Sequence, residues 1–362
     1  MVILKKIYIT TFLILIVLSL QVISLSISTN NNNSIIKDQN MNLDSFSTNN
    51  KSSSTSNSIV VTQPFIADFV KNIVGDQFSV SSIIKGTEDP HSYTPTLSDT
   101  LAVSSANIFM YFGIADIDGW ASGIISAIPS SVRVVKLVNL SQDGLYDPYI
   151  GSGELNPHLW MWPSFVNSTL LQRIYEAVVQ FDPVHSAIYE KNLQVYRLKL
   201  DALIGRIQGN ATLLKDVKVV EYHAAYFYLL REMNVTRLGA IEQIEDQQPS
   251  AVHFANISSV IKKEVDHGNT VVIVQSLNIP PDTTYQVARD TGAQISYVAA
   301  LIGNYKTVNL TNYIQMIDYD LVALTHPVSA PNSPLPGFEL PIVVPSLILI
   351  SSVLIILRKI NK

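Results

Sequence analysis

Residues 184–208 read VHSAIYEKNLQVYRLKLDALIGRIQ. Apolar residues recur in this segment at three- and four-residue spacings, and no glycine interrupts it before Gly205. Pro183 precedes it, at a first-turn position where a missing N–H costs nothing. The pattern therefore predicts one continuous helix over 183–208, roughly 35 Å long. A helix of this length would be a rigid strut that joins the parts of the chain on either side of it.

Short apolar runs alternate with helical patterns on both sides of this helix. Before it, we expect strands at 58–62, 78–84 and 108–112 and helices at 64–74 and 97–105. After it, we expect strands at 217–222 and 270–275 and helices at about 225–233, 253–266 and 282–291. Fully apolar strands that alternate with helices are typical of parallel sheets covered on both faces. The predicted fold class is α/β, with an N-terminal lobe over 59–182 and a C-terminal lobe over 209–326.

Both ends of the chain differ from this body in composition. Lys5 and Lys6 precede a mostly apolar run, which predicts a signal peptide or an N-terminal anchor over 1–27. The Ser-, Asn- and Thr-rich residues 28–58 predict a disordered stalk. After the body, the sequence predicts a Pro-rich spacer (327–339), a transmembrane helix (340–357) and a basic cytoplasmic tail (358–362). The basic ends place the folded body on the extracellular side of the cell membrane; a buried core helix is the alternative for 340–357.

Composition limits the classes of function. A net charge of −5 with interspersed signs gives no support for nucleic-acid binding. The chain has no cysteine, so a metal would have to be held by His, Asp, Glu or backbone oxygen. In an exported chain, six sequons predict glycosylation on surface loops: Asn139, Asn167, Asn210, Asn234, Asn256 and Asn309.

Three of the seven histidines lie in distinctive contexts: DPHSY at 89–93, NPHLW at 156–160 and EYH at 221–223. A neutral imidazole is the commonest protein ligand for borderline-soft divalent metals. We therefore expect His91, His158 and His223 to form a metal site. The other four histidines are expected to be ordinary core or surface residues: His185, His253, His267 and His326.

These motifs, in this order around the predicted helix, resemble the zinc/manganese substrate-binding proteins of ABC transporters, known as cluster A-I metal receptors. The resemblance covers about 59–326 and rests on Asp89-Pro90-His91-Ser92-Tyr93, Pro157-His158-Leu159-Trp160 and Tyr222-His223-Ala224-Ala225. It implies two lobes with a metal site in the cleft between them. His91 and His158 would come from the N-terminal lobe, and His223 from the C-terminal lobe. It also implies a receptor that captures a divalent metal outside the cell and delivers it to the permease of an ABC importer.

The chain departs from the family at the fourth ligand. The family usually has an Asp after the last strand, whereas the matching stretch here, 297–301, reads YVAAL and places Ala299 at that position. Asn156 replaces the usual Asp before the second motif's proline, and Ala224 replaces an acidic residue that often follows the third His. Glu88 is a candidate substitute ligand. Candidate hydrogen-bond acceptors for the ligand rings are Asp89, Asp99 and Glu221.

Three imidazoles and a fourth position open to water suit tetrahedral Zn²⁺, whereas Mn²⁺ prefers oxygen-rich sites. The sequence therefore favours zinc over manganese, although copper and nickel also bind imidazole. Two other functions stay open. The missing Asp fits a metal-binding surface adhesin or ectodomain that takes no part in transport. A zinc hydrolase would also use three His ligands, but the chain has no catalytic signature such as His-Glu-x-x-His, so we expect no enzyme.

Overall fold

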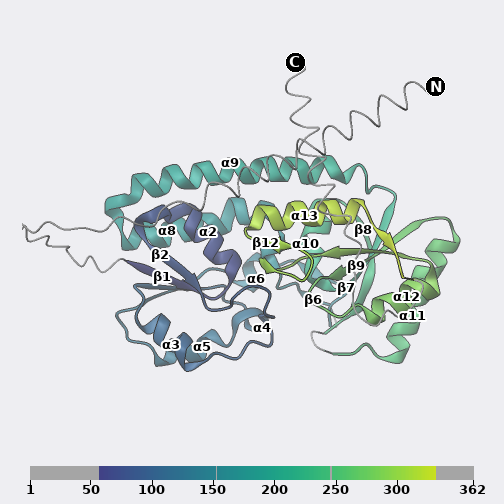
Figure 1. Ribbon diagram of the computed structural model, residues 1–362, viewed down its shortest axis with the longest axis horizontal. Coiled ribbons are helices and arrows are strands. Elements are labelled where there is room, and N and C mark those ends of the chain that lie inside the picture. Colours follow the sequence, from purple (N-terminus) through teal and green to yellow (C-terminus); the bar gives the residue numbers. More distant parts are fainter. Residues whose placement is uncertain (1–56, 152, 245–246, 332–362) are drawn as a thin grey trace, which may run out of the picture. The chain divides into compact units, whose positions relative to one another are not determined.

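The predicted strut is one continuous helix, α9 (Ser186–Ala211), which follows the short turn η4 (Pro183–His185) and runs along both lobes (Figure 1). The structure is a computed structural model that describes residues 57–151, 153–244 and 247–331. All of these residues belong to one compact unit. The α/β class and the two lobes joined by a long helix are confirmed.

The N-terminal lobe contains a four-stranded parallel sheet with the order β2-β1-β3-β4. Its strands are β1 (Ser58–Val61), β2 (Ser79–Ser82), β3 (Ile108–Tyr111) and β4 (Arg133–Lys136). Helices α3 (Leu97–Ser104) and α5 (Ala121–Ala127) pack on one face, and α2 (Pro64–Val74) and α8 (Leu171–Phe181) on the other. The other elements that precede α9 are short: η1 (Gly75–Gln77), α4 (Ala115–Asp118), α6 (Leu140–Asp143), the hairpin β5 (Tyr146–Asp147) and β6 (Glu154–Leu155), η2 (Leu159–Met161), α7 (Pro163–Phe165) and η3 (Val166–Leu170).

The C-terminal lobe contains a five-stranded sheet with the order β13-β10-β9-β7-β8, in which only the edge strand β13 is antiparallel. Its strands are β7 (Val217–His223), β8 (Thr236–Glu242), β9 (Thr270–Ser276), β10 (Gln294–Val298) and β13 (Val328–Ser329). Helices α11 (Ala251–Asp266) and α12 (Asp282–Thr291) cover one face, and α10 (Phe227–Glu232) and α13 (Tyr313–Thr325) the other. The turn η5 (Ala224–Tyr226) follows β7, and β11 (Gly303–Asn304) and β12 (Asn309–Leu310) form a small hairpin.

One continuous hydrophobic core connects the two lobes. It includes Phe65 and Phe69 of α2, Val272 and Val274 of β9, and the buried face of α9. That face consists of Tyr189, Leu193, Tyr196, Leu200, Leu203 and Ile207. Because this spacing follows a single helical stripe, other apolar positions of α9 point outward. The long helix is therefore part of the core of both lobes and not merely a connector between them.

The C-terminal sheet runs further along the chain than predicted. Val328 and Ser329 pair with β10, so the C-terminal lobe extends past 326 into the predicted spacer. Strands β4 and β8 were missed because charged residues or glycine interrupt their apolar character.

In the part of the chain that the structure describes, no helix combines the length and the apolar character needed to cross a bilayer. The predictions for 1–27, for nearly all of 28–58, and for 340–357 and 358–362 fall outside the described residues.

The role of α9 in the core can be tested with two leucines on opposite sides of the helix. Leu200 is 0% exposed and Leu198 is 69% exposed. Leu200→Ala should lower the free energy of unfolding by about 2–5 kcal/mol, because it removes buried methyl groups and leaves a cavity. The matched control Leu198→Ala should change it by less than about 0.5 kcal/mol. Urea unfolding of the two variants measures the difference, and equal losses would contradict the assigned packing face.

Candidate metal centre

The three histidines of the sequence motifs come from different elements. His91 lies in the loop between β2 and α3, and His158 lies between β6 and η2. His223 is the last residue of β7, which lies between β8 and β9 in the C-terminal sheet. Chain connections leave β7 toward one side and β9 toward the other. This switch point, at the carboxyl ends of the strands, is where open α/β sheets place their ligands.

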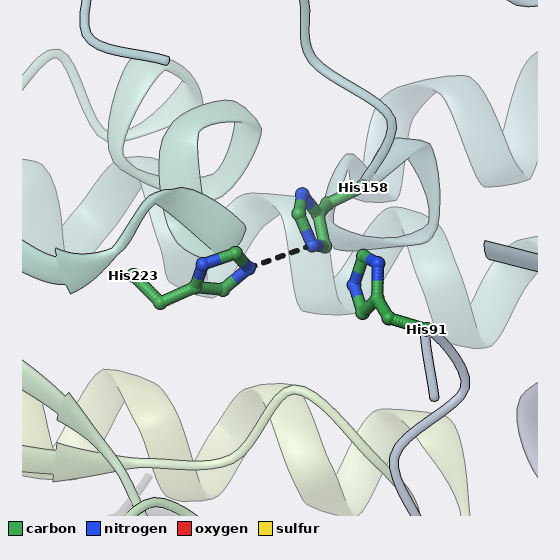
Figure 2. Close-up of side chains that lie close together, drawn as sticks. All are labelled: His91, His158 and His223. Atoms are coloured by element: carbon green, nitrogen blue, oxygen red, sulfur yellow. Dashed lines mark hydrogen bonds between the residues drawn. The ribbon is translucent and has the colours of Figure 1, made fainter. Parts of the chain in front are cut away.

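The structure brings all three imidazoles together (Figure 2). The Nε2 atoms of His158 and His223 lie 3.1 Å apart. One ring nitrogen from each histidine lies within 4.8 Å of the others. Two nitrogens bound to one tetrahedral zinc, at about 2.0–2.1 Å each, would lie about 3.3 Å apart. The spacing between His158 and His223 is therefore already close to that needed for a shared metal ion.

The loop that carries His91 is held by its neighbours on the N-terminal lobe. Trp120 Nε1 donates to the carbonyl of Pro90 at 3.1 Å, and the Tyr93 and Trp120 rings are 5.0 Å apart. The Asp89 carboxylate accepts from the backbone N–H of His91 at 2.9 Å. Directly after this loop, Thr96 and Asp99 form a capping box that starts α3. These contacts fix the loop on both sides of His91.

His158 is a fully buried ring. Its Nδ1 lies 3.0 Å from the side-chain oxygen of Asn156, which leaves Nε2 facing His223. Burial lowers the pKa of His158 well below its ordinary value, and repulsion from the imidazoles of His223 and His91 adds to this effect. The ring is therefore neutral at physiological pH, which is the form that binds a metal.

His223 has an anionic partner that the sequence analysis missed. Its Nδ1 lies 3.2 Å from the carboxylate of Glu242, the last residue of β8. The two residues are direct neighbours across the parallel strands β7 and β8. Carboxylates that orient a ligand histidine in this way are typical of metal sites. Glu242 could have been predicted as a neighbour of His223, because both residues end adjacent parallel strands. The sequence analysis did not predict β8, so it did not predict this contact.

The residues suggested as ring acceptors have other partners. Asp99 accepts from Tyr93 and from the backbone of Thr96, and Glu221 contacts Arg237 and the backbone N–H of Tyr226. The suggested substitute ligand, Glu88, accepts from the backbone N–H of Lys85 at 2.9 Å and does not belong to the histidine cluster. The third suggested acceptor, Asp89, accepts from the backbone N–H of His91. Asn156 and Glu242, which had not been suggested, contact the rings of His158 and His223.

A cavity of ≈ 30 Å³ lies at the cluster, enough for a single ion or one to two waters. It is lined by Asp89, Pro90, His91, His158, Trp160, His223, Ala225, Ser276, Asn278, Ile279, Ala300 and Leu301. Ala299, which we aligned with the family's aspartate, is absent from this wall; it is fully buried, and its N–H donates to Asp320 at 2.7 Å. The wall residue that follows β10 is Ala300, whose carbonyl accepts from Trp160 Nε1.

The other four histidines lie outside this cluster. His253 Nε2 bonds to the carbonyl of Ala240, and His185 Nδ1 pairs with Asp182. His267 ends α11, and His326 ends α13. Their placement at helix ends and in local hydrogen bonds agrees with the expectation that they are ordinary core or surface residues.

Comparison with known sequences shows the family. Residues 59–326 match the family described as "ZnuA: Zinc-uptake complex component A periplasmic". The chain is 27% identical over 270 residues to the iron-binding protein YfeA of Yersinia pestis, a match that covers 72% of this chain and 82% of YfeA. It is 31% identical over 263 residues to the metal ABC transporter substrate-binding lipoprotein SsaB of Streptococcus sanguinis, covering 64% and 82% of the two chains.

Solved structures share the fold. The periplasmic zinc-binding protein TroA of Treponema pallidum superposes with a TM-score of 0.63 at 20% identity, covering 75% of this chain and 98% of TroA. The substrate-binding protein FpvC of Pseudomonas aeruginosa, solved with Mn²⁺, gives a TM-score of 0.63 at 21% identity, covering 75% and 97%. The family consists of receptors and not of enzymes, in agreement with the sequence expectation. The chain belongs to the ZnuA family of metal-binding substrate-binding proteins of ABC importers.

Proposed function

We propose that this receptor binds Zn²⁺ through His91, His158 and His223 and delivers it to an importer permease. The observation that carries the proposal is the convergence of three ring nitrogens, from separate elements, within 4.8 Å of one another. The family is described by zinc uptake, whereas its listed relatives are named for iron, manganese or unspecified metals, so the family alone leaves the cargo open. The choice among these metals therefore depends on which ligand atoms this chain provides.

The chemistry of the wall favours zinc over manganese. The three candidate ligands are imidazoles, and the wall contributed by the C-terminal lobe supplies the neutral side chains of Ser276 and Asn278. Ala300 stands on that wall after β10, near the position where the family usually has its aspartate. Manganese prefers several oxygen ligands, whereas zinc accepts three nitrogens and one water.

A membrane tether completes the proposal. The relatives include proteins named lipoproteins, but these 362 residues contain no cysteine to carry a lipid. The uncharged segment 340–357 would instead hold the receptor on the extracellular face, at an effective concentration near the permease set by the spacer. Sugars on the sequons of the body, such as Asn210 on α9, would then face outward. An adhesin without a transport role is the alternative, and it would need no cognate permease.

The first test is zinc-dependent stabilisation of the extracellular body. A ligand that binds only the native state at 100 times its Kd adds about 2.7 kcal/mol to the free energy of unfolding. Zinc should therefore raise the melting temperature of the wild-type protein. The His91→Ala/His223→Ala double variant should lose this shift, whereas His267→Ala at the exposed end of α11 should keep it. An equal shift in the double variant would refute the assigned ligands.

The second test adds the missing oxygen ligand. Ala300→Asp should place a carboxylate on the cavity wall, which should raise manganese affinity by about tenfold or more and zinc affinity by less. Ala299→Asp is the matched control. It should lower the melting temperature without any gain in affinity, because it buries a carboxylate beside Asp320. Competition titrations with both metals measure the affinities, and unchanged values for Ala300→Asp would exclude this position as the fourth ligand site.

The third test is fractionation of cells that express the full chain or a truncation after Pro336. The full chain should need detergent for extraction, because an apolar helix of 18 residues spans a bilayer. The truncation should be soluble if the N-terminal segment is removed. Release of the full chain by salt alone would refute the tether, and retention of the truncation would assign the anchor to residues 1–27.

A further inference from the structure

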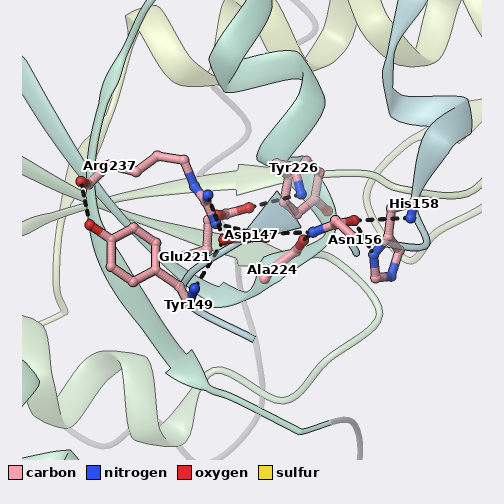
Figure 3. A network of polar contacts seen from close by, with 8 residues as sticks. All are labelled: Asp147, Tyr149, Asn156, His158, Glu221, Ala224, Tyr226 and Arg237. Carbon is pink, nitrogen blue, oxygen red and sulfur yellow. Dashed lines mark hydrogen bonds and ion pairs between the residues drawn. The ribbon is translucent and has the colours of Figure 1, made fainter. Parts of the chain in front are cut away.

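Asn156 is completely buried between the lobes, and both ends of its amide are fully used (Figure 3). Its Oδ1 accepts from the backbone N–H and from Nδ1 of His158, both at 3.0 Å. Its Nδ2 donates to Asp147 Oδ2 at 3.0 Å and to the carbonyl of Ala224 at 2.8 Å. Because both partners of Nδ2 are acceptors and the N–H of His158 is a donor, these neighbours determine the orientation of the amide.

These bonds join the two halves of the metal centre. Asn156 and His158 belong to the N-terminal lobe, whereas Ala224 directly follows His223 in the C-terminal lobe. One amide therefore contacts the ring of one candidate ligand and the peptide group next to another. The distance between His158 and His223 is set in part by this side chain.

A buried ion pair anchors the far side of the amide. Arg237 of β8 donates two parallel hydrogen bonds to Asp147, both at 3.0 Å, and also pairs with Glu221. Its guanidinium lies between the rings of Tyr149 and Phe227, 5.1 and 4.8 Å from their centres. Bidentate pairs of this kind restrict geometry more than a single contact does. Asp147 and Asn156 precede the linking helix in the chain, whereas Arg237 and Ala224 follow it, so the network joins these two segments through two separate contacts.

Only an amide satisfies this position. An aspartate of the same size could still accept from His158, but when ionised it has no hydrogen for Asp147 or Ala224, and when protonated it has one hydrogen for two acceptors. Its second oxygen would face a carboxylate and a carbonyl at hydrogen-bond distance, in a buried environment where unpaired charge is costly. The replacement of the family's usual aspartate by Asn156 therefore creates a link between the lobes that a carboxylate cannot make.

We propose that Asn156 is a positioning residue that holds His158 and His223 at metal-binding distance before the metal arrives, with Asp147 and Arg237 as its anchor. This inference rests on the proposed zinc site. With these two rings held together, the cleft stays closed without metal, and the contacts of Pro90 with Trp120 and of Asp89 with the His91 backbone hold the third ring in its loop. Such pre-organisation lowers the cost of binding and offsets the missing fourth ligand.

The first measurement is metal binding by Asn156→Asp and Asn156→Ala. Loss of a group that orients a metal ligand typically lowers affinity 10–100-fold, and we expect a loss of this size for zinc in both variants. Bound Co²⁺ should also lose the strong visible absorption of tetrahedral coordination. The control Asn192→Asp loses an amide–carbonyl bond of α9 away from the histidines, to Ile73 at 3.0 Å, and should bind as the wild type does. If Asn156→Asp does not fold, the uncharged Asn156→Ala variant decides.

The second measurement is the distance between the lobes. The chain has no cysteine, so Ser126→Cys on α5 and Ser259→Cys on α11 introduce two unique, exposed sites for spin labels. The metal-free wild type should give one narrow distance distribution that zinc leaves unchanged. Both Asn156 variants should give a broader distribution without metal.

The outcomes separate this inference from the proposed function. If wild-type protein binds no zinc, the proposed function fails. If it binds zinc, but the Asn156 variants match it in affinity, Co²⁺ spectrum and distance distribution, only the positioning role is refuted. A wild-type distance that shifts on zinc addition would likewise refute the closed metal-free state.

Discussion

The shared hydrophobic core along α9 is the constraint on which the metal centre depends. Side chains of both lobes pack against the same face of this helix, so the lobes do not have separate interiors. Helix α13 reinforces the arrangement: the backbone N–H of Tyr313 donates to Asp68 of α2, and its hydroxyl donates to the carbonyl of Trp160. Close-packed interiors resist deformation. Three histidines from separate loops can therefore meet at a fixed spacing.

The rings of His223 and His158 have polar partners of different chemistry. Glu242 gives His223 an anionic partner, whereas Asn156 gives His158 a neutral one. Burial lowers the pKa of His158, which favours its uncharged form, and the Glu242 carboxylate adds an acidic group beside the ring of His223. The site thus combines three imidazoles with an acidic group beside one of them. This combination suits a divalent cation that must be bound firmly and later released to a partner.

The linking helix, the alternating strands and the three histidines were predictable from local patterns. The continuous apolar runs of β3 and β9 predict strands directly, whereas β4 and β8 contain charged residues and were not predicted. Because β8 was not predicted, one residue of the site was not predicted either. Glu242 becomes a neighbour of His223 only through the pairing of two strands that are separated along the chain. The sequence likewise did not predict that Ala300 lies on the cavity wall. The alignment with the family had indicated its neighbour Ala299.

The sequence alone determined the α/β class, the long helix and the residues with metal-binding chemistry, because periodicity and residue type are local properties. Only the tertiary structure decided which partner each ring has. Asn156 looked like the loss of a carboxylate in the sequence, yet in the fold its amide joins Asp147, His158 and Ala224. Hydrogen bonds of this kind depend on distances of a few tenths of an ångström between segments far apart in the chain. A sequence motif does not specify those distances.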